Sequence, residues 1–306
     1  MPQTLPNPLV QAGVADRAAS AGRTFDAPVL LRFWHLTSLD APTVAAVWSL
    51  GFAWAAGVRL PVWIPILLAL TAWAVYIADR LFDARTALRS FDLSSLRERH
   101  RFHHRHRRTL IPVAIAAACA AGWIVFTLMP WAARERNSLL GIAALAYFAH
   151  VHAPRTLTVG LTRLSRLLQK EMLVGLLFTA ACALPAISRA TPRKGSVPWP
   201  VCAAAILFAF LAWLNCHSID RWEVVGEQET GKPLILVPAC LLAFAGLMLA
   251  ASLSSTQPRP AALAVTGAVS ALLLALLDGI RSRLTPLAVR ACADLVLLAP
   301  LALLLK

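Results

Sequence analysis

Two pairs of acidic residues interrupt an otherwise apolar chain, and each pair is spaced so that its members share one face of a helix. Asp79 and Asp83 end the run "VYIADRLFDAR" at residues 75–85, four positions apart. Asp220 and Glu223 lie three positions apart in "LNCHSIDRWEVVGEQE" at 214–229. Residues three or four apart lie on the same side of a helix. Each pair is therefore predicted to present two carboxylates together.

Paired carboxylates of this kind suit magnesium and the phosphates that magnesium binds. Magnesium keeps several of its waters and binds one or two carboxylates together with substrate phosphates. Two such pairs on one side of a membrane can hold two ions around a diphosphate and neutralise it as a leaving group. The alternative is that the acids pair with neighbouring arginines and cap helix ends at the interface.

The composition places these acids in a membrane protein. Of the 306 residues, 58% are hydrophobic and 14% are charged, whereas soluble domains carry about 25% charged residues. Continuous apolar blocks, rather than alternating ones, predict helices and not a barrel. Nine blocks are long enough to cross a membrane; they lie at residues 39–58, 61–81, 110–132, 138–154, 170–188, 198–219, 234–254, 260–279 and 285–305. We expect an all-α integral membrane protein with nine transmembrane helices in a single bundle.

The distribution of Lys and Arg predicts the orientation of these helices. The chain has 29 basic and 15 acidic residues, a net charge of +14, and most basic residues lie on the side of the N-terminus, above all in residues 80–108. Cytoplasmic loops carry such an excess. The N-terminus is therefore predicted to be cytoplasmic and the C-terminus outside, with both acidic pairs at cytoplasmic helix ends. Basic residues between apolar blocks argue against nucleic acid as a partner, which needs a basic groove with stacking aromatics.

The N-terminal segment and the cysteines indicate the cellular location and the absence of disulfide or zinc-ribbon motifs. Residues 1–28 are polar and lack the apolar core of a signal peptide, so we expect a disordered cytoplasmic tail followed by a transmembrane domain at 29–306. The six cysteines lie in apolar blocks without a CxxC, which predicts neither disulfides nor a zinc ribbon. The Ala-, Leu- and Arg-rich composition fits a GC-rich bacterium, and we place the protein in the inner (cell) membrane as a multi-pass protein.

A basic segment, "RERHRFHHRHRRT" at 97–109, follows the first acidic pair. Its arginines suit anionic lipid headgroups or a diphosphate, because guanidinium groups bind phosphate oxygens in pairs. A third reading is a zinc site, because His100, His103 and His104 share a face if the segment is helical. Neighbouring arginines repel a divalent cation and weaken that reading.

Several other polar residues fall inside or beside apolar blocks. Arg290 and Asp294 are four apart in the ninth block and are predicted to pair on one face. Asp40 precedes the first block, where an acid complements the helix macrodipole. Lys170 and Glu171 begin the fifth block and are predicted to be interfacial.

The acidic runs resemble the two aspartate-rich motifs of the UbiA-type intramembrane prenyltransferases. "ADRLFDAR" is similar to the first motif, and "SIDRWE" to the second, which ends the sixth helix of that family. The resemblance implies nine helices with both motifs on the cytoplasmic side. It also implies a reaction, the magnesium-assisted transfer of an isoprenyl group from its diphosphate to an acceptor that we expect to be aromatic.

The resemblance implies roles for individual residues. Asp79, Asp83, Asp220 and Glu223 take the places of the catalytic, metal-binding acids. Contacts with the diphosphate or the acceptor are expected from one amide and five arginines: Asn215, Arg155, Arg80, Arg221, Arg101 and Arg105. Membrane lipids, the isoprenyl diphosphate and the small-molecule acceptor are the expected partners.

Two other functions stay open. Val75 and Tyr76 stand where the family's first motif opens with Asn-Asp, and neither binds magnesium well. This departure favours a catalytically inactive UbiA-like protein that binds a prenyl lipid or diphosphate, or acts in assembly. A small-solute transporter is the third possibility. Against it, the charged residues cluster at one membrane face, whereas transporters place their sites near the midplane.

Overall fold

The protein is almost entirely helical in the part of the chain that the structure, a computed structural model, describes: residues 25–89, 98–152, 170–225 and 233–305. The helices are α2 (Val29–Leu36), α3 (Asp40–Ala56), α4 (Trp63–Arg89), α5 (Glu98–Arg105), α6 (Arg107–Thr127), α7 (Trp131–His152), α9 (Lys170–Lys194), α10 (Trp199–Val225), α11 (Leu236–Leu253), α12 (Pro258–Ile280), α13 (Pro286–Val296) and α14 (Leu301–Leu304), with a 3₁₀ turn, η4, at Arg281–Arg283. Within these ranges, extended pairing is limited to a bridge between Phe25 and Leu284.

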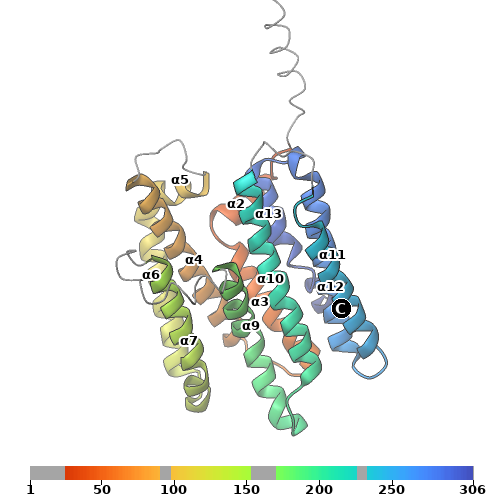
Figure 1. Ribbon diagram of the computed structural model, residues 1–306. Coiled ribbons are helices and arrows are strands. Elements are labelled where there is room, and N and C mark those ends of the chain that lie inside the picture. Colours follow the sequence, from red (N-terminus) through yellow and green to blue (C-terminus); the bar gives the residue numbers. More distant parts are fainter. Residues whose placement is uncertain (1–24, 90–97, 153–169, 226–232, 306) are drawn as a thin grey trace, which may run out of the picture.

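The long helices run side by side in one bundle (Figure 1). Helices α4 to α7 stand on one side, and α3 with α9 to α13 forms the rest. The C-terminal ends of α4 and α10, which carry the two acidic pairs, lie at the same end of the bundle, and α5 covers part of that end (Figure 1). The fold therefore brings both motifs to one face of the protein.

Six helices are long and apolar enough to cross a membrane by length and composition; they are α4, α6, α9, α10, α11 and α12. All six turn large apolar side chains outward, among them Trp123 and Phe126 on α6 and Leu241 and Phe244 on α11. Exposed apolar surface on this scale marks contact with lipid rather than water. The chain is a multi-pass membrane protein.

Three of the nine predicted spans have a different form in the structure. The first is α3, which has 17 residues and is mostly buried against its neighbours. The fourth falls within α7, which begins near Arg134, Glu135 and Arg136. The ninth is divided into α13, with 11 residues, and α14, with 4 residues.

The interruption after α13 has a local cause and compensating contacts. Pro300 lacks an N–H and disfavours helix for the residue before it, and the chain forms tight turns such as Leu297 N to Asp294 O at 3.2 Å. The carbonyls that the helix no longer uses accept bonds from other helices. Trp48 Nε1 donates to Leu297 O at 2.8 Å, and Ser270 Oγ donates to Val296 O at 2.8 Å. A broken helix is tolerated inside a membrane protein when its free backbone groups find such partners.

The segment before α2 also contacts the bundle. Phe25 N donates to Arg283 O at 2.8 Å, and Thr285 N donates to Phe25 O at 3.0 Å. Asp26 accepts from the Thr285 hydroxyl at 2.9 Å. The last residues of the predicted tail are thus attached to the turn between α12 and α13, while residues 1–24 lie outside the described part.

The core lies between α3, α9, α10, α12 and α13. Trp48 stacks on Phe208 with ring centroids 3.8 Å apart, and Phe52 packs against both rings. Elsewhere the helices approach through small residues. On α11, Gly246 lies so close to Ala264 and Ala268 of α12 that an added Cβ would come within 3.1 Å of Ala268 Cβ. Close packing through small residues is the usual means of helix association in membranes.

Gly175 makes the closest such approach and provides a stability test. A Cβ at this position would lie 2.9 Å from Ala209 O and 3.0 Å from Trp213 N, both backbone atoms of α10. We expect Gly175→Ala to separate α9 from α10 and to destabilise the fold by about 1–3 kcal/mol. Thermal unfolding of the purified protein in detergent measures this loss.

Gly122→Ala is the matched control for this prediction. Gly122 is on α6, and an added Cβ there meets no atom within 4 Å. Alanine favours helix over glycine by up to about 1 kcal/mol, so the control should be neutral or slightly stabilising. Equal melting temperatures for the two variants would contradict the close contact between α9 and α10.

Candidate functional site

Polar side chains from three other helices lie within electrostatic range of Tyr147 on α7. They are Asp79 on α4, Glu171 on α9 and Cys216 on α10. Tyr76, one turn before Asp79, is within range of Cys216 as well. Asp79, Tyr147, Glu171 and Cys216 are all partly buried. We call these four residues the central polar site.

Three buried polar atoms on α7, α9 and α10 lack hydrogen-bond partners among the described residues. The Tyr147 hydroxyl is buried and makes no hydrogen bond to any described residue, and the same is true of Thr179 Oγ1 on α9 and Trp213 Nε1 on α10. Most buried polar groups in proteins are hydrogen-bonded, so an unpartnered group calls for an explanation. Groups of this kind are suited to contact a polar ligand.

The other acid of the first motif, Asp83, is also partly buried on α4. Arg80, between the two acids in sequence, turns into the protein and is 5% exposed. Its guanidinium donates to His35 O at 3.1 Å and to Asp40 Oδ2 at 3.3 Å. The arginine that we predicted as a substrate contact is thus already engaged with a buried carboxylate.

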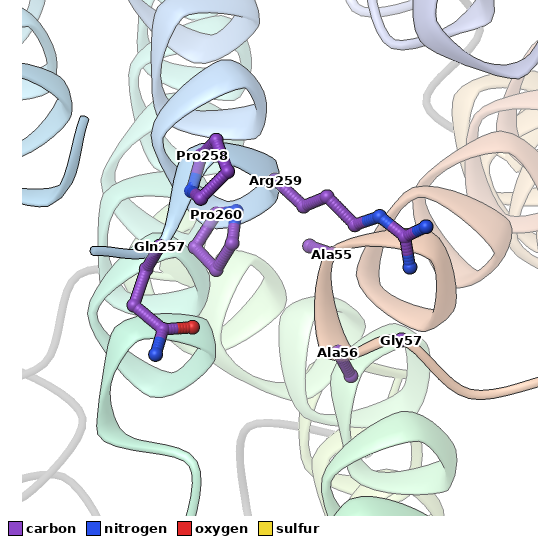
Figure 2. A pocket seen from close by; sticks show the side chains of 7 residues that line it. All are labelled: Ala55, Ala56, Gly57, Gln257, Pro258, Arg259 and Pro260. Carbon is purple, nitrogen blue, oxygen red and sulfur yellow. The ribbon is translucent and has the colours of Figure 1, made fainter. Parts of the chain in front are cut away.

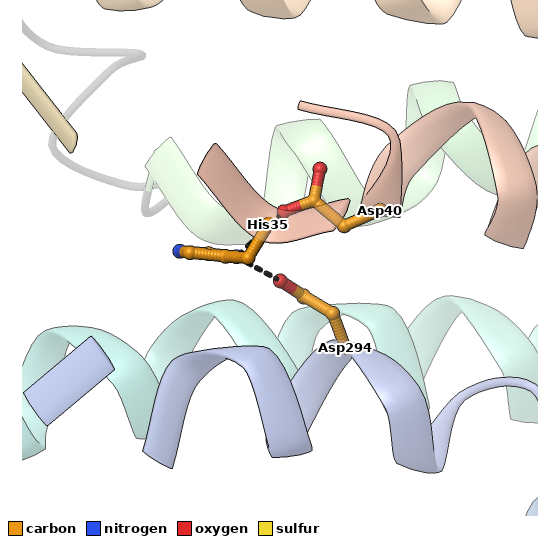
Figure 3. A group of neighbouring side chains, drawn as sticks. All are labelled: His35, Asp40 and Asp294. Atoms are coloured by element: carbon orange, nitrogen blue, oxygen red, sulfur yellow. Dashed lines mark ion pairs between the residues drawn. The ribbon is translucent and has the colours of Figure 1, made fainter. Parts of the chain in front are cut away.

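A second polar group is built from three elements that are distant in sequence (Figure 3). His35 ends α2, Asp40 begins α3 and Asp294 lies on α13. His35 Nδ1 is 2.8 Å from Asp40 Oδ2 and 3.5 Å from Asp294 Oδ2. Burial acts to lower the pKa of His35, but contacts with Asp294 and Asp40 outweigh this effect and raise the pKa above its usual value. We call these three residues the His–Asp cluster.

The two acids of the second motif, Asp220 and Glu223, lie in different surroundings in the structure. Asp220 and Arg221 are exposed at the end of α10. Glu223 is partly buried and forms an ion pair with Arg290 of α13. Asn215, which the sequence placed beside this pair, is buried and donates to Asp294 Oδ1 at 3.1 Å. Arg290 was predicted to pair with Asp294, whereas the structure records Glu223 as its ion-pair partner.

The basic segment forms α5, which packs against α4 and α2. Arg101 and Arg105 are exposed there, and Arg155 lies outside the described residues. His103 is fully buried: its Nε2 lies 3.2 Å from Ser38 Oγ, and its Nδ1 lies 2.8 Å from Arg99 O. Burial lowers the pKa of His103 to about 4, so the ring is neutral at pH 7. Both ring nitrogens already have hydrogen-bond partners, so His103 is not available as a ligand for the zinc site that was considered for this segment.

Two cavities lie at opposite ends of the molecule. One, of about 320 Å³, is lined by Gly57, Gln257 and Arg259 at the C-terminal end of α3 (Figure 2), away from the acids. The other, of about 470 Å³, lies between α4, α5 and α6. Leu81, Phe82 and Ile111 supply its apolar lining, and Arg85, His104 and Arg107 supply basic groups. This basic groove lies beside the first acidic motif and suits an anionic group attached to an apolar chain.

The His–Asp cluster is the one group of three or more described acid, His or Cys ligand atoms within 4.8 Å of one another. The four predicted metal ligands, Asp79, Asp83, Asp220 and Glu223, do not form such a group. Glu171, Tyr147, His35, Asp40 and Asp294 were not predicted as site residues. The signals available were weak: Asp40 and Glu171 begin helices, where acids are common for electrostatic reasons alone.

Comparison of the chain with protein-family models, with curated proteins and with solved structures finds no match. The resemblance of the two acidic runs to prenyltransferase motifs therefore rests on those residues themselves.

Proposed function

We propose that the protein transfers an isoprenyl group from its diphosphate to a small-molecule acceptor within the membrane. In this proposal nine segments cross or enter the inner (cell) membrane, with the N-terminus cytoplasmic and the C-terminus outside. The observation that carries the proposal is the position of Asp79. It lies toward the motif-bearing end of the bundle and within electrostatic range of Tyr147, whose buried hydroxyl has no hydrogen-bond partner among the described residues.

The residues at the central polar site fit magnesium in part. Asp79 and Glu171 offer carboxylate oxygens from two helices, and both lie within electrostatic range of Tyr147. Magnesium takes one or two protein carboxylates with substrate phosphates, so Asp79, with Asp83 four residues further along the same helix, would hold it once the diphosphate supplies the other ligands. The bound ion would neutralise the charge that develops on the diphosphate. The second pair fits less well, because Asp220 is exposed and Glu223 is paired with Arg290.

The chain's own residues would bind and orient the two substrates. Arg85 and Arg107, in the basic groove beside the motif, attract the diphosphate. Tyr147 and Trp213 offer hydroxyl and indole N–H groups that lack partners among the described residues. The apolar bundle around them excludes water from the allylic carbon, which favours attack by the acceptor over hydrolysis.

A second candidate, binding without turnover, is favoured by the Glu223–Arg290 ion pair. Glu223 neutralises Arg290, which is mostly buried. Moving Glu223 away to bind a metal ion would leave the buried charge of Arg290 without compensation, and this is costly. A protein that lacks the second metal-binding pair can still bind a diphosphate through Asp79 and the basic groove. It would hold a prenyl diphosphate or lipid without releasing pyrophosphate.

Pyrophosphate release separates these functions. Purified protein in detergent is incubated with isoprenyl diphosphates of several chain lengths and a panel of aromatic acceptors, with and without Mg²⁺. We expect acceptor-dependent release that requires Mg²⁺. Mg²⁺-dependent binding without release would support the binding protein. Neither binding nor release at any chain length would overturn both proposals and favour transport of a small solute.

A further inference from the structure

We propose that His35, Asp40 and Asp294 form a binding site for one divalent transition-metal ion of the zinc class. This site shares no residue with the central polar site and does not depend on the prenyl-transfer proposal. Its residues come from α2, α3 and α13 and meet inside the bundle (Figure 3). None of them belongs to either acidic motif.

The spacing of the ligand atoms suits a metal ion. One nitrogen and two carboxylate oxygens lie within 4.8 Å of one another, with N–O separations of 2.8 Å and 3.5 Å. Zinc binds His nitrogen and Asp oxygen at about 2.0–2.2 Å, which places tetrahedral ligand atoms about 3.3 Å apart. Only small shifts of the side chains would therefore complete the site.

The direction of the His35 ring also favours a metal over a simple hydrogen bond. Nδ1 is close to both carboxylates, yet it makes no hydrogen bond of acceptable direction to a described residue. A metal ion on the lone pair of Nδ1 would take its other ligands from positions to the side of that direction, whereas a hydrogen bond needs its acceptor in line with the N–H. The nitrogen ligand favours zinc-class ions over magnesium and calcium, which prefer oxygen alone.

Asn215 provides an independent indication of a ligand. It is 5% exposed and is held against the cluster by its Nδ2, which donates to Asp294 Oδ1. Its other polar atom, Oδ1, is buried and has no hydrogen-bond partner among the described residues. An unpartnered amide oxygen at the edge of a His–Asp cluster is a candidate fourth ligand, since carbonyl oxygens coordinate metals.

The charges around the cluster explain why a cation is favourable there. His35 is 2% exposed and Asp40 is 1% exposed, so their charged forms gain little from solvent. Arg80 compensates one carboxylate at 3.3 Å. A metal ion bound to neutral His35 would supply the positive charge beside the two carboxylates that a proton on the ring otherwise supplies. Arg80 also fixes the orientation of Asp40, which is a common role for groups around metal ligands.

Metal content of the purified protein tests the site. The full chain, without a polyhistidine tag, is purified in detergent, exposed to Zn²⁺ and passed through a desalting column, and its metal is measured by mass spectrometry. We expect about one zinc per chain. His35→Gln removes the nitrogen ligand and Asp294→Asn removes a carboxylate charge, with little change in side-chain volume, and each should weaken zinc binding by more than about 100-fold.

Two controls locate the ion. Replacing His106, the residue that follows α5, by Ala removes an exposed histidine that lies outside the cluster, and this variant should keep its zinc. Zinc should also raise the melting temperature of the wild type but not of Asp294→Asn. The proposal is overturned if the wild type holds no zinc and shows no thermal shift. In that case a proton on His35, and not a metal ion, balances the charge of the two carboxylates. It is also overturned if His35→Gln binds zinc as the wild type does.

Discussion

Replacing Asp79 by asparagine should reduce Mg²⁺-dependent pyrophosphate release by more than about 100-fold, the usual loss when one preorganised electrostatic group is removed from an active site. Asparagine keeps the size of the side chain and one oxygen but removes the charge. Asp79 is partly buried and within electrostatic range of Tyr147, and the effect of a charge in such a place is greater than in water. The initial rate of release at saturating acceptor measures the loss.

Two other acidic residues, Glu135 and Asp220, provide the comparison variants for this prediction. Glu135→Gln removes an exposed acid near the start of α7 and should leave the rate unchanged. Asp220→Asn asks whether the second motif takes part: a loss equal to that of Asp79→Asn would support two cooperating acidic pairs despite the exposure of Asp220. A rate within about threefold of the wild type for Asp79→Asn would remove Asp79 from the site and return it to an interfacial role.

Asp278→Ala should cause the largest loss of stability, about 3–5 kcal/mol, as expected for breaking a buried charged network. Asp278 is 1% exposed near the end of α12. Its carboxylate accepts from Leu234 N at 2.6 Å, Ile235 N at 3.0 Å, Trp222 Nε1 at 2.8 Å and Arg281 at 2.7 Å. One side chain therefore joins the end of α10, the start of α11 and η4.

Alanine at this position leaves two backbone N–H groups and one indole N–H without this acceptor, while Arg281 keeps its bond to Asp278 O at 2.9 Å. Unsatisfied buried donors cost more than the bonds themselves contribute. Asp278→Asn keeps the shape and one acceptor oxygen, so its melting temperature should fall between those of the wild type and Asp278→Ala. Thermal unfolding in detergent gives this order.

Asp26→Ala is the control for this experiment. Asp26 also bonds a threonine and an arginine, but it is exposed at the surface. Solvent replaces such bonds, so little change is expected. If Asp278→Ala melts at the same temperature as Asp26→Ala, the connection through Asp278 does not hold these elements together.

The class of the protein could be read from the sequence, because the membrane imposes a one-dimensional requirement. A spanning helix must satisfy its own backbone hydrogen bonds and remain apolar over its length. The predicted spans at 61–81, 110–132, 170–188, 198–219, 234–254 and 260–279 accordingly overlap the six long apolar helices. This requirement for spanning helices does not predict whether a segment buried inside the protein, such as α3 or α13, forms one continuous helix. Trp48 and Ser270, distant in sequence, supply the bonds that stabilise the break after α13.

The partners of the polar residues were decided by the tertiary structure. Spacing along one helix correctly indicated that Asp79 and Asp83 share a helix end, but it could not show that Arg80 turns inward to Asp40 or that Glu223 pairs with Arg290. His35 and Asp294 are separated by most of the chain and meet only because α2 and α13 pack together. Local periodicity determines which face a side chain occupies. The charge that it meets there depends on another helix, and no local pattern in the sequence specifies which one.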